Sequence, residues 1–422
     1  MVRRALILFL AAFWFVASIR ANVDTDRAVL DEHVRTLQVR SVSDYLATGT
    51  PVVVIGSQDV IRIDFDMLDD DRRYLRYEII HCNSDWQPSA LSYLEYLDGF
   101  NEGTIDDYEF SAATTVAYVH YRLLLPNEQV QFKVSGNYVV RIYDENNPDE
   151  TLIRARFCVS EGRVPVAGFV TSRTDVDFNA AHQQLELEVD CEGIPNANLF
   201  TDIIVAVEQN GRPDAVHHLG HPLRVSGRRM IFEHQPELIF DAGNEYRRFE
   251  TVSNALPGMN VDAIEYHAPY YNHYLIVDIP RSSAGYLYDE TLNGGFVVRE
   301  YNSDDSDVEA DYVVVHFALE MPELLGADIF LDSDALNRTF GPESRMIYNR
   351  GTGRYEKALL LKQGQYNYQY LTVPFGKNGG ETAEIEGNKY QTRNSYAVKV
   401  YTRIPGERYD RLVGHAIVKS NQ

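Results

Sequence analysis

Apolar and polar positions alternate along much of the chain. From Ile61 to Met67, in IRIDFDM, the odd positions are apolar and the even positions are charged. The stretches Leu185–Val189, 313–319 and Val398–Val400 repeat this alternation. Because successive side chains of a strand point to opposite faces, the pattern predicts strands with one face buried and one face in water.

Clusters of turn-forming residues separate the predicted strands at short intervals. YDENNPDETLI, for example, joins the apolar runs Tyr138–Tyr143 and Leu152–Val159 as a hairpin would. Amphipathic helices are nearly absent; RAVLDEHVRTL, residues 27–37, is the best short candidate, and it can instead lead into a strand. We therefore predict an all-β fold of tandem immunoglobulin-like sandwiches.

The first residues have the composition of an export signal. Arg3 and Arg4 precede an apolar run, Ala5–Ala17, and small residues follow it. A retained membrane anchor is the competing interpretation, but a run of about 13 residues is short for a span of roughly 20. We predict a cleaved signal peptide over residues 1–21, with a cut after Ser18 as the alternative.

The remaining length of about 400 residues predicts two or three domains. The joint SEGRVPVAG and the acidic stretch REYNSDDSDVEADY suggest the boundaries. We predict an N-terminal β-sandwich over residues 22–160, a middle β-rich domain over 161–303 and a C-terminal sandwich over 304–422.

The chain is strongly acidic, with 62 carboxylates against 39 Lys and Arg side chains and a net charge of −23. Nucleic-acid binding needs a positive surface, so this balance disfavours it and fits a soluble exported protein. The acidic run Asp304–Asp311 offers oxygen ligands for calcium. It lacks the glycine turn and the terminal spacing of a calcium loop, and we interpret it as a solvated linker.

Residues with catalytic or metal-binding chemistry form no recognisable motif. The chain has no G-x-S-x-G and no phosphate-binding loop, and Gly351-Thr-Gly353 is typical of a tight turn. His217, His218 and His221 have no second set of ligands. Carboxylate pairs are too abundant to be informative. We predict no enzyme, no cofactor and no metal site.

The three cysteines, Cys82, Cys158 and Cys191, are an odd number and form no C-x-x-C motif, so we interpret them as buried structural residues. Cys82 belongs to Arg76–Phe100, which places a histidine, a cysteine and a tryptophan within six residues. Its NSD turn ends a strand, and we expect Trp86 to pack over the edge of a sandwich core.

Several stretches, in this order, resemble the Plug protein family of the Bacteroidetes type IX secretion system. The resemblance runs from about residue 30 to the C-terminus. The stretches include YEIIHCNSDWQPSALSYLEYLDGF, IDDYEFSAATTVAYVHYRLLLPN, SGNYVVRIYDE, DETLNGGFVVREYN and MIYNRGTGRYEKALLLKQGQYNYQYL.

This resemblance implies a non-enzymatic subunit that binds the periplasmic opening of a giant outer-membrane β-barrel translocon. The subunit would seal the opening when no cargo passes, and it would be periplasmic and associated with the outer membrane. The motif positions, which we interpret as structural, are His81, Cys82, Asn83, Asp85, Trp86, Ser135, Gly136, Asn137 and Tyr138.

Tyr270, Tyr271 and Tyr274, in APYYNHY, are candidates for the contact with the translocon, because tyrosine is favoured at interfaces. The alternation predicts that some of them fill a core instead.

Residues from about 310 onward also resemble an early-set immunoglobulin-like domain of the glycogen-binding type. The alternative function is therefore a periplasmic or surface carbohydrate-binding protein. Such modules stack sugars on tryptophan, which this segment lacks, although Tyr348, Tyr366, Tyr368 and Tyr370 could stack more weakly. A β-sandwich hydrolase with a carboxylate site is a further alternative.

Overall fold

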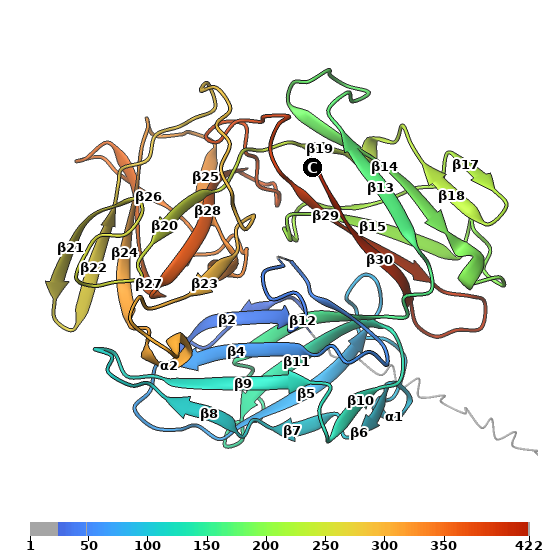
Figure 1. Ribbon diagram of the computed structural model, residues 1–422, viewed down its shortest axis with the longest axis horizontal. Coiled ribbons are helices and arrows are strands. Elements are labelled where there is room, and N and C mark those ends of the chain that lie inside the picture. Colours follow the sequence, from blue (N-terminus) through green and yellow to red (C-terminus); the bar gives the residue numbers. More distant parts are fainter. Residues whose placement is uncertain (1–23, 48, 421–422) are drawn as a thin grey trace, which may run out of the picture.

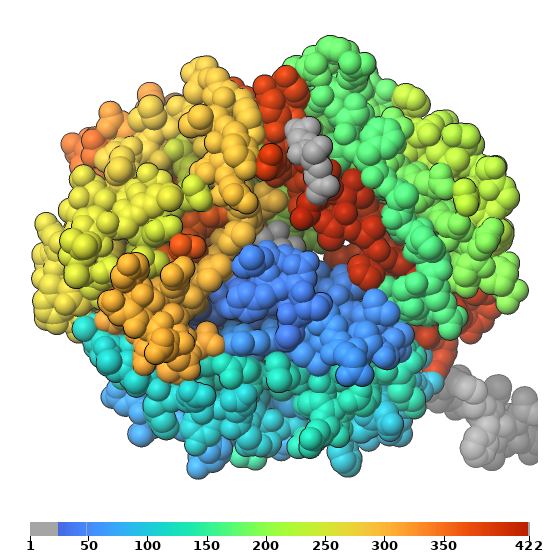
Figure 2. Space-filling model, viewed as in Figure 1, coloured from blue at the N-terminus to red at the C-terminus, as the bar shows by residue number. Residues whose placement is uncertain are grey.

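The computed structural model describes residues 24–47 and 49–420, so the predicted signal peptide, residues 1–21, lies outside the described residues. Three β-rich lobes lie around a central hollow (Figures 1 and 2). We define lobe 1 as residues 24–163. Lobe 2 combines residues 164–242 with 388–420, and lobe 3 is residues 243–387.

Lobe 1 is a sandwich of two main sheets, in the orders β1-β12-β11-β5-β7 and β2-β4-β9-β8. Strand β3 runs parallel to β12, and β6 pairs with β10 in a small third sheet. The strands and the single-turn helix are β1 (Ala28–Val29), β2 (Val34–Ser41), β3 (Val52–Val54), β4 (Ile61–Met67), β5 (Leu75–Cys82), α1 (Tyr93–Tyr96), β6 (Leu97–Gly99), β7 (Glu102–Thr104), β8 (Asp107–Phe110), β9 (Val119–Leu125), β10 (Val130–Phe132), β11 (Gly136–Asp144) and β12 (Ile153–Ser160).

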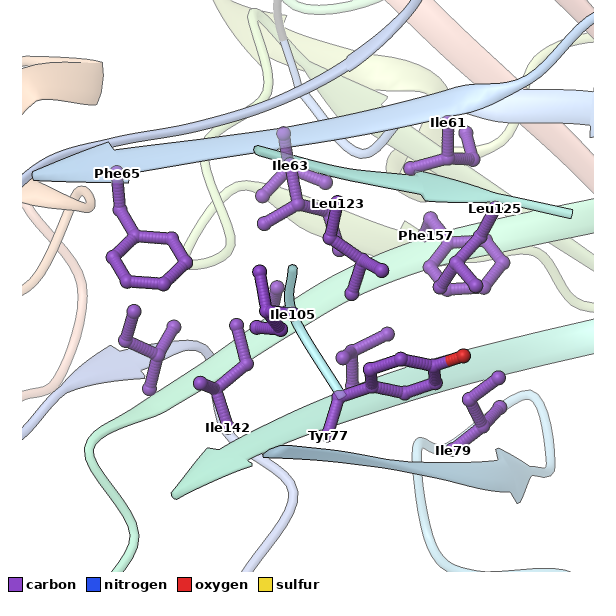
Figure 3. Packing of buried hydrophobic residues seen from close by; sticks show 14 of the residues in the cluster. Ile61, Ile63, Phe65, Tyr77, Ile79, Ile105, Leu123, Leu125, Ile142 and Phe157 are labelled. Atoms are coloured by element: carbon purple, nitrogen blue, oxygen red, sulfur yellow. The ribbon is translucent and has the colours of Figure 1, made fainter. Parts of the chain in front are cut away.

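Alternation builds the core of lobe 1. The odd positions of β4, among them Ile63 and Phe65, are fully buried and face side chains of the opposite sheet such as Tyr77 and Ile142 (Figure 3). Each such side chain contributes about 1.5–3 kcal/mol when it leaves water, so this layer holds the two sheets together.

Lobe 2 is completed by the end of the chain. One sheet has the order β13-β14-β18-β17, with β19 also on β14, and the other has the order β16-β15-β29-β30. Its elements are β13 (Val166–Thr171), β14 (His182–Asp190), η1 (Cys191–Gly193), β15 (Ile203–Gln209), β16 (Val216–His218), β17 (Arg224–Ser226), β18 (Arg229–Phe232), η2 (Pro236–Leu238), β19 (Ile239–Asp241), β29 (Ser395–Thr402) and β30 (Arg411–Lys419).

Lobe 3 lies between the two parts of lobe 2 in the sequence. Its long strand β28 pairs with β20, β23 and β25, and the facing sheet has the order β21-β22-β24-β27-β26. Its elements are β20 (Arg247–Glu250), β21 (Val261–His267), β22 (Tyr270–Leu275), β23 (Phe296–Val298), α2 (Ser306–Glu309), β24 (Tyr312–Glu320), β25 (Ala327–Asp332), η3 (Asp334–Leu336), β26 (Ile347–Asn349), β27 (Arg354–Lys362) and β28 (Gly364–Pro374).

The all-β prediction is confirmed, since the α-helices among residues 24–47 and 49–420 are two single turns. The helix candidate over residues 27–37 is wrong: the segment forms β1 and the start of β2, as the alternative interpretation had it. Sheets cross the boundary predicted at residue 304, because β15 pairs with β29 and β20 pairs with β28. The three predicted domain ranges stay a prediction.

Candidate functional site

Strand β5 is followed by a tight turn, residues 83–87, which lies at the contact between lobes 1 and 2. We call this turn and the residues packed against it the corner. The amide of Asn83 donates to the carbonyl of Gln87 (2.8 Å), and that of Trp86 donates to the carbonyl of Asn83 (2.9 Å). Trp86 has a left-handed φ of 63°, which is uncommon for a bulky residue. The carboxylate of the exposed Asp85 accepts from the amide of Gln87 (2.9 Å), so the turn is held by local bonds.

His81 is a buried, neutral member of this corner. Its Nε2 lies 3.1 Å from the carbonyl oxygen of Ser135, and its Nδ1 lies 2.8 Å from Oγ of Ser89. A carbonyl can only accept, so Nε2 carries the hydrogen and Nδ1 accepts from the serine hydroxyl. Burial lowers the pKa of His81 to about 4. The ring therefore has the bonding of a structural histidine.

Gly136 lies directly against this ring. Its φ is 145°, and a Cβ added there would come within 2.4 Å of Nε2 of His81. Tyr138, two residues further along β11, is fully buried and donates its hydroxyl to the carbonyl of Val134 (2.8 Å). Gly136 and Tyr138 thus both pack against the ring of His81.

Bonds from this turn reach lobe 2 through one carboxylate. Asp410 accepts from the amide (3.0 Å) and the hydroxyl (2.7 Å) of Ser84, and its own amide donates to Oδ1 of Asn83 (3.2 Å). Nε of Arg403 donates to the other carboxylate oxygen of Asp410, Oδ1 (2.7 Å). Residues more than 300 positions apart are thus fixed to each other.

Asn137 makes the second connection between these lobes. Its Oδ1 accepts from the hydroxyl of Tyr401 in lobe 2 (2.8 Å) and from Sγ of Cys158 (3.2 Å). Its Nδ2 donates to the carbonyl of Asn83 (2.9 Å). Both ends of this fully buried amide are used, as burial requires.

Trp86 packs where the two lobes meet. Its apolar neighbours include Cys158 of lobe 1 and both Tyr401 and Leu412 of lobe 2. The guanidinium of Arg156 lies 4.3 Å from the centre of its ring, in cation–π geometry. The tryptophan thus covers a contact between two lobes.

The three cysteines are free and buried, as predicted. Burial raises the pKa of Cys82 to about 12 and that of Cys158 to about 11, which keeps both as thiols at neutral pH.

A second contact, between lobes 1 and 3, is built from buried charges. Asp66 of β4 is fully buried and meets Nζ of Lys362 (2.6 Å), Nδ1 of His120 (2.7 Å) and the hydroxyl of Tyr312 (2.6 Å). Nζ of Lys362 also donates to the carbonyl of Asp307 (2.6 Å). We call these five residues the clamp.

Two arginines of lobe 1 extend the clamp at Asp307. Its Oδ2 lies 2.6 Å from Arg62 and 3.0 Å from Arg122. Burial of the Asp307 carboxyl opposes its ionisation, but His120 and Arg62 hold its pKa below the usual value. The charges of lobe 3 are therefore balanced by side chains of lobe 1.

Charge states within the clamp follow from its geometry. Burial of Asp66 opposes its ionisation, but Lys362 and His120 lower its pKa below the usual value. Burial of His120 opposes its protonation, but the carboxylates of Asp64 and Asp66 raise its pKa to about 9. At neutral pH the clamp therefore contains two carboxylates, those of Asp66 and Asp307, beside the two cations Lys362 and His120.

The sequence interpretation of β4 is wrong for its charged positions. We expected them in water, but Asp64 is 4% and Asp66 0% exposed. Lobe 3 covers this face, and alternation along one strand cannot report what a distant segment covers. On the lobe 3 side, the sequence KALLLKQGQ offers a hint of a buried charge, because the cation Lys362 directly follows an apolar run.

The acidic run 304–311 is likewise part of the contact. Asp311 accepts from the amide (3.1 Å) and hydroxyl (2.6 Å) of Thr115 in lobe 1, and Asp305 caps helix α2 through the amide of Asp307 (3.2 Å). The interpretation as a solvated linker is therefore wrong for Asp307 and Asp311. Within the described part of the chain, no three His, Cys, Asp or Glu side chains are placed to hold a metal ion.

The candidate interface tyrosines lie on the hairpin β21–β22 of lobe 3, and all three are half-buried. Tyr271 packs toward the core with its ring 4.9 Å from Tyr266, and Tyr274 stacks on His316 at 4.4 Å. Tyr270 begins β22 and pairs with His267, the last residue of β21, beside the turn of the hairpin. Their role at an interface stays a prediction.

The tyrosines considered for sugar stacking lie mostly inside lobe 3. Tyr366, Tyr368 and Tyr370 are buried, and the hydroxyls of the last two donate to Asp278 (2.7 and 2.8 Å). Tyr348 is half-buried against the core. These four residues therefore form no exposed platform.

Comparisons with known proteins agree with the resemblance seen in the sequence. A family model described as the type 9 secretion system plug protein 1st domain matches residues 34–161, which is most of lobe 1. A search of the curated proteins found no match. Among the described residues, no helix is both long and apolar enough to cross a membrane.

One solved structure is similar over nearly the whole chain. It is a hypothetical protein from Parabacteroides merdae, 41% identical, with a TM-score of 0.92, and the match covers 94% of this chain and 100% of that one. An alkylpurine DNA glycosylase from Pseudomonas fluorescens, 14% identical over 30% of each chain, has a TM-score of 0.18 and carries no argument. The chain belongs to the type 9 secretion system plug protein family, whose first domain is the main part of lobe 1.

Proposed function

We propose that this protein is a non-enzymatic periplasmic subunit of the type IX secretion system. It binds the periplasmic opening of the outer-membrane β-barrel translocon and closes it when no cargo passes. The observation that carries this proposal is the family match over residues 34–161, together with a relative that shares the fold of the whole chain.

The use of the buried polar groups supports a role as a rigid body. Asp66 and Lys362 join lobe 1 to lobe 3, and Asp410 joins lobe 2 to the turn of lobe 1. The partners of these charged groups are side chains and backbone groups of the protein itself, so the groups hold the lobes together. A body that blocks an aqueous opening needs a fixed shape and a modest polar interface that can release.

Finer structural assignments belong to the same proposal. The sandwiches would be immunoglobulin-like, with an early-set domain at the C-terminal end. The ranges 22–160, 161–303 and 304–422 stay a prediction for the domains, and two sheets pair strands across residue 304. Tyr270, Tyr271 and Tyr274 would contribute to the contact with the translocon, because a half-buried tyrosine offers both a rigid ring and a hydroxyl.

The test is an affinity purification of the tagged mature protein from outer-membrane extract, with mass spectrometry of what is recovered. We expect one very large barrel protein, absent when an unrelated exported protein carries the tag. Cells that lack this protein should also leak small periplasmic molecules through the translocon. Recovery of no barrel protein by an intact bait in several detergents contradicts the proposal, and glycan arrays would then test the carbohydrate alternative.

A further inference from the structure

One edge of strand β27 is unpaired over the last six of its nine residues. On that side, β26 pairs only with residues Arg354–Glu356. Just before β26 the chain crosses to the other sheet, where Met346 donates to the carbonyl of Ile329 (2.8 Å) and Arg345 bridges to Phe330. This crossing leaves residues 357–362 of β27 without a neighbouring strand on the side opposite β24, among the described strands.

The register identifies the backbone groups at this edge. The amide of Gln363 donates to the carbonyl of Asp311 (2.8 Å), so this pair is a hydrogen-bonded one. Bonded and non-bonded pairs alternate in an antiparallel ladder. Ala358 and Leu360 therefore direct their N–H and C=O groups away from β24. No hydrogen bond from residues 24–47 or 49–420 reaches these four groups.

A cavity of about 460 Å³ lies along this edge. Its walls are residues 358–362 of β27 and residues 34–37 of β2 in lobe 1. Strand β2 is also the last strand of its sheet, and a bulge between Arg35 and Gln38 interrupts its ladder. The apolar lining includes Phe296, Leu336, Leu359, Leu361 and Tyr366. We call this cavity the edge slot.

We propose that the edge slot binds an extended peptide segment of a partner protein, which adds as a strand to β27. The peptide would bond Ala358 and Leu360 through its backbone, and its alternate side chains would fill the apolar lining. Five residues at about 3.3 Å each span roughly 17 Å, the length of the free edge. Since free strand edges are normally blunted or covered, an edge that opens into an apolar slot favours a bound strand.

The surroundings of the slot restrict its occupant. The lining charges that are exposed are Glu32 and Glu343, whereas Asp31 is paired with Arg73 and Lys362 with Asp66. Residues flanking the bound segment would therefore be neutral or basic. The cavity is bounded by β27 on one side and by β2 on the other. A folded second copy would bring a neighbouring strand that meets the wall of β2. The proposal does not rest on the plug function, because any partner with a suitable segment can satisfy it.

The test uses a phage-displayed library of random nonapeptides on the full mature protein, after depletion on the variant Leu360→Pro. Proline removes the Leu360 N–H, which points into the slot, and leaves the bonds to β24 in place. We expect enriched sequences with alternating apolar residues. A synthetic enriched peptide should lose at least about tenfold in affinity on Leu360→Pro.

The variant Leu360→Ala is the matched control, because it shortens the side chain but keeps the N–H, and it should bind within about threefold of the parent. Hydrogen exchange of residues 357–362 should slow when the peptide is added. The absence of enrichment, or equal affinity for a Leu360→Pro variant with a native circular dichroism spectrum, overturns the proposal. So does concentration-dependent dimerisation of the parent that Leu360→Pro abolishes, since the occupant would then be a second copy.

Discussion

Two buried histidines of lobe 1 take opposite charge states. His81 bonds a hydroxyl and a carbonyl, and burial lowers its pKa to about 4. Burial also opposes the charge on His120, but the neighbouring carboxylates Asp64 and Asp66 raise its pKa to about 9. Burial disfavours the charged form in both, so the partners decide the outcome.

Gly136 should resist substitution more than a glycine of positive φ that lies in open space. In Gly136→Ala the new methyl group would meet the ring of His81, which hydrogen bonds hold from both sides. We expect a loss of about 2–4 kcal/mol in the free energy of unfolding, measured with urea.

The control is Gly227→Ala, at a φ of 63° with no atom within 4 Å of the added Cβ. It should lose about 1 kcal/mol, the cost of the backbone conformation alone. Equal losses in the two variants would show that His81 is not tightly held.

Lys362 should be required because Asp66 is buried beside it. In Lys362→Met the Asp66 carboxylate keeps His120 and the Tyr312 hydroxyl but loses the ammonium at 2.6 Å, and we expect a loss of about 3–5 kcal/mol in the free energy of unfolding. The control Lys377→Met breaks an exposed pair with Glu381 and should cost less than about 1 kcal/mol.

A second substitution separates charge from packing at the clamp. Adding Asp66→Asn to Lys362→Met removes the uncompensated charge, so the double variant should recover part of the loss. A double variant that loses the full sum of the two single losses would contradict the electrostatic explanation.

At the scale of elements, the turn after β5 holds the loop between β29 and β30. Asp410 of that loop accepts both polar hydrogens of Ser84 and the guanidinium of Arg403. Asp410→Ala leaves these donors without their acceptor, and we expect a loss of about 1–3 kcal/mol.

Hydrogen exchange measures where this loss appears. Residues 83–87 and 403–411 should exchange faster in Asp410→Ala, whereas Asp98→Ala, at an exposed position outside the contact, should leave them unchanged. Unchanged exchange in Asp410→Ala would mean that the other contacts, among them the bond from Tyr401 to Asn137 and the packing of Trp86, hold the two lobes without this carboxylate.

At the scale of the molecule, the clamp predicts how stability depends on pH. The pKa of His120 is raised from 6.5 to about 9, so its contribution is complete below pH 6.5 and is lost as pH rises toward 9. The pKa of Asp66 is lowered, so its contribution is present above its usual pKa of 3.8 and is lost as pH falls through the lowered value.

The melting temperature between pH 6 and pH 9.5 tests the alkaline side. We expect the parent to lose up to about 3 kcal/mol over this range, and His120→Asn to lose much less, because asparagine does not titrate. Parallel curves for the two proteins would show that His120 is not protonated in the folded state.

The sequence alone determined the fold class, because alternation along a strand is a local property. The odd positions of Ile61–Met67 were assigned to a core and are buried there. The family could also be recognised from the sequence, because motifs such as HCNSDW are runs of consecutive residues and need no tertiary structure to be identified.

Only the tertiary structure decided what covers the outer faces and where the chain closes on itself. Asp66 and Lys362 lie 296 positions apart in the sequence, and nothing local to either specifies the other. The pairing of β15 with β29 likewise brings the end of the chain into lobe 2. Contacts between lobes depend on how whole sheets pack, so one strand's pattern shows that a face is polar but not whether water or another lobe meets it.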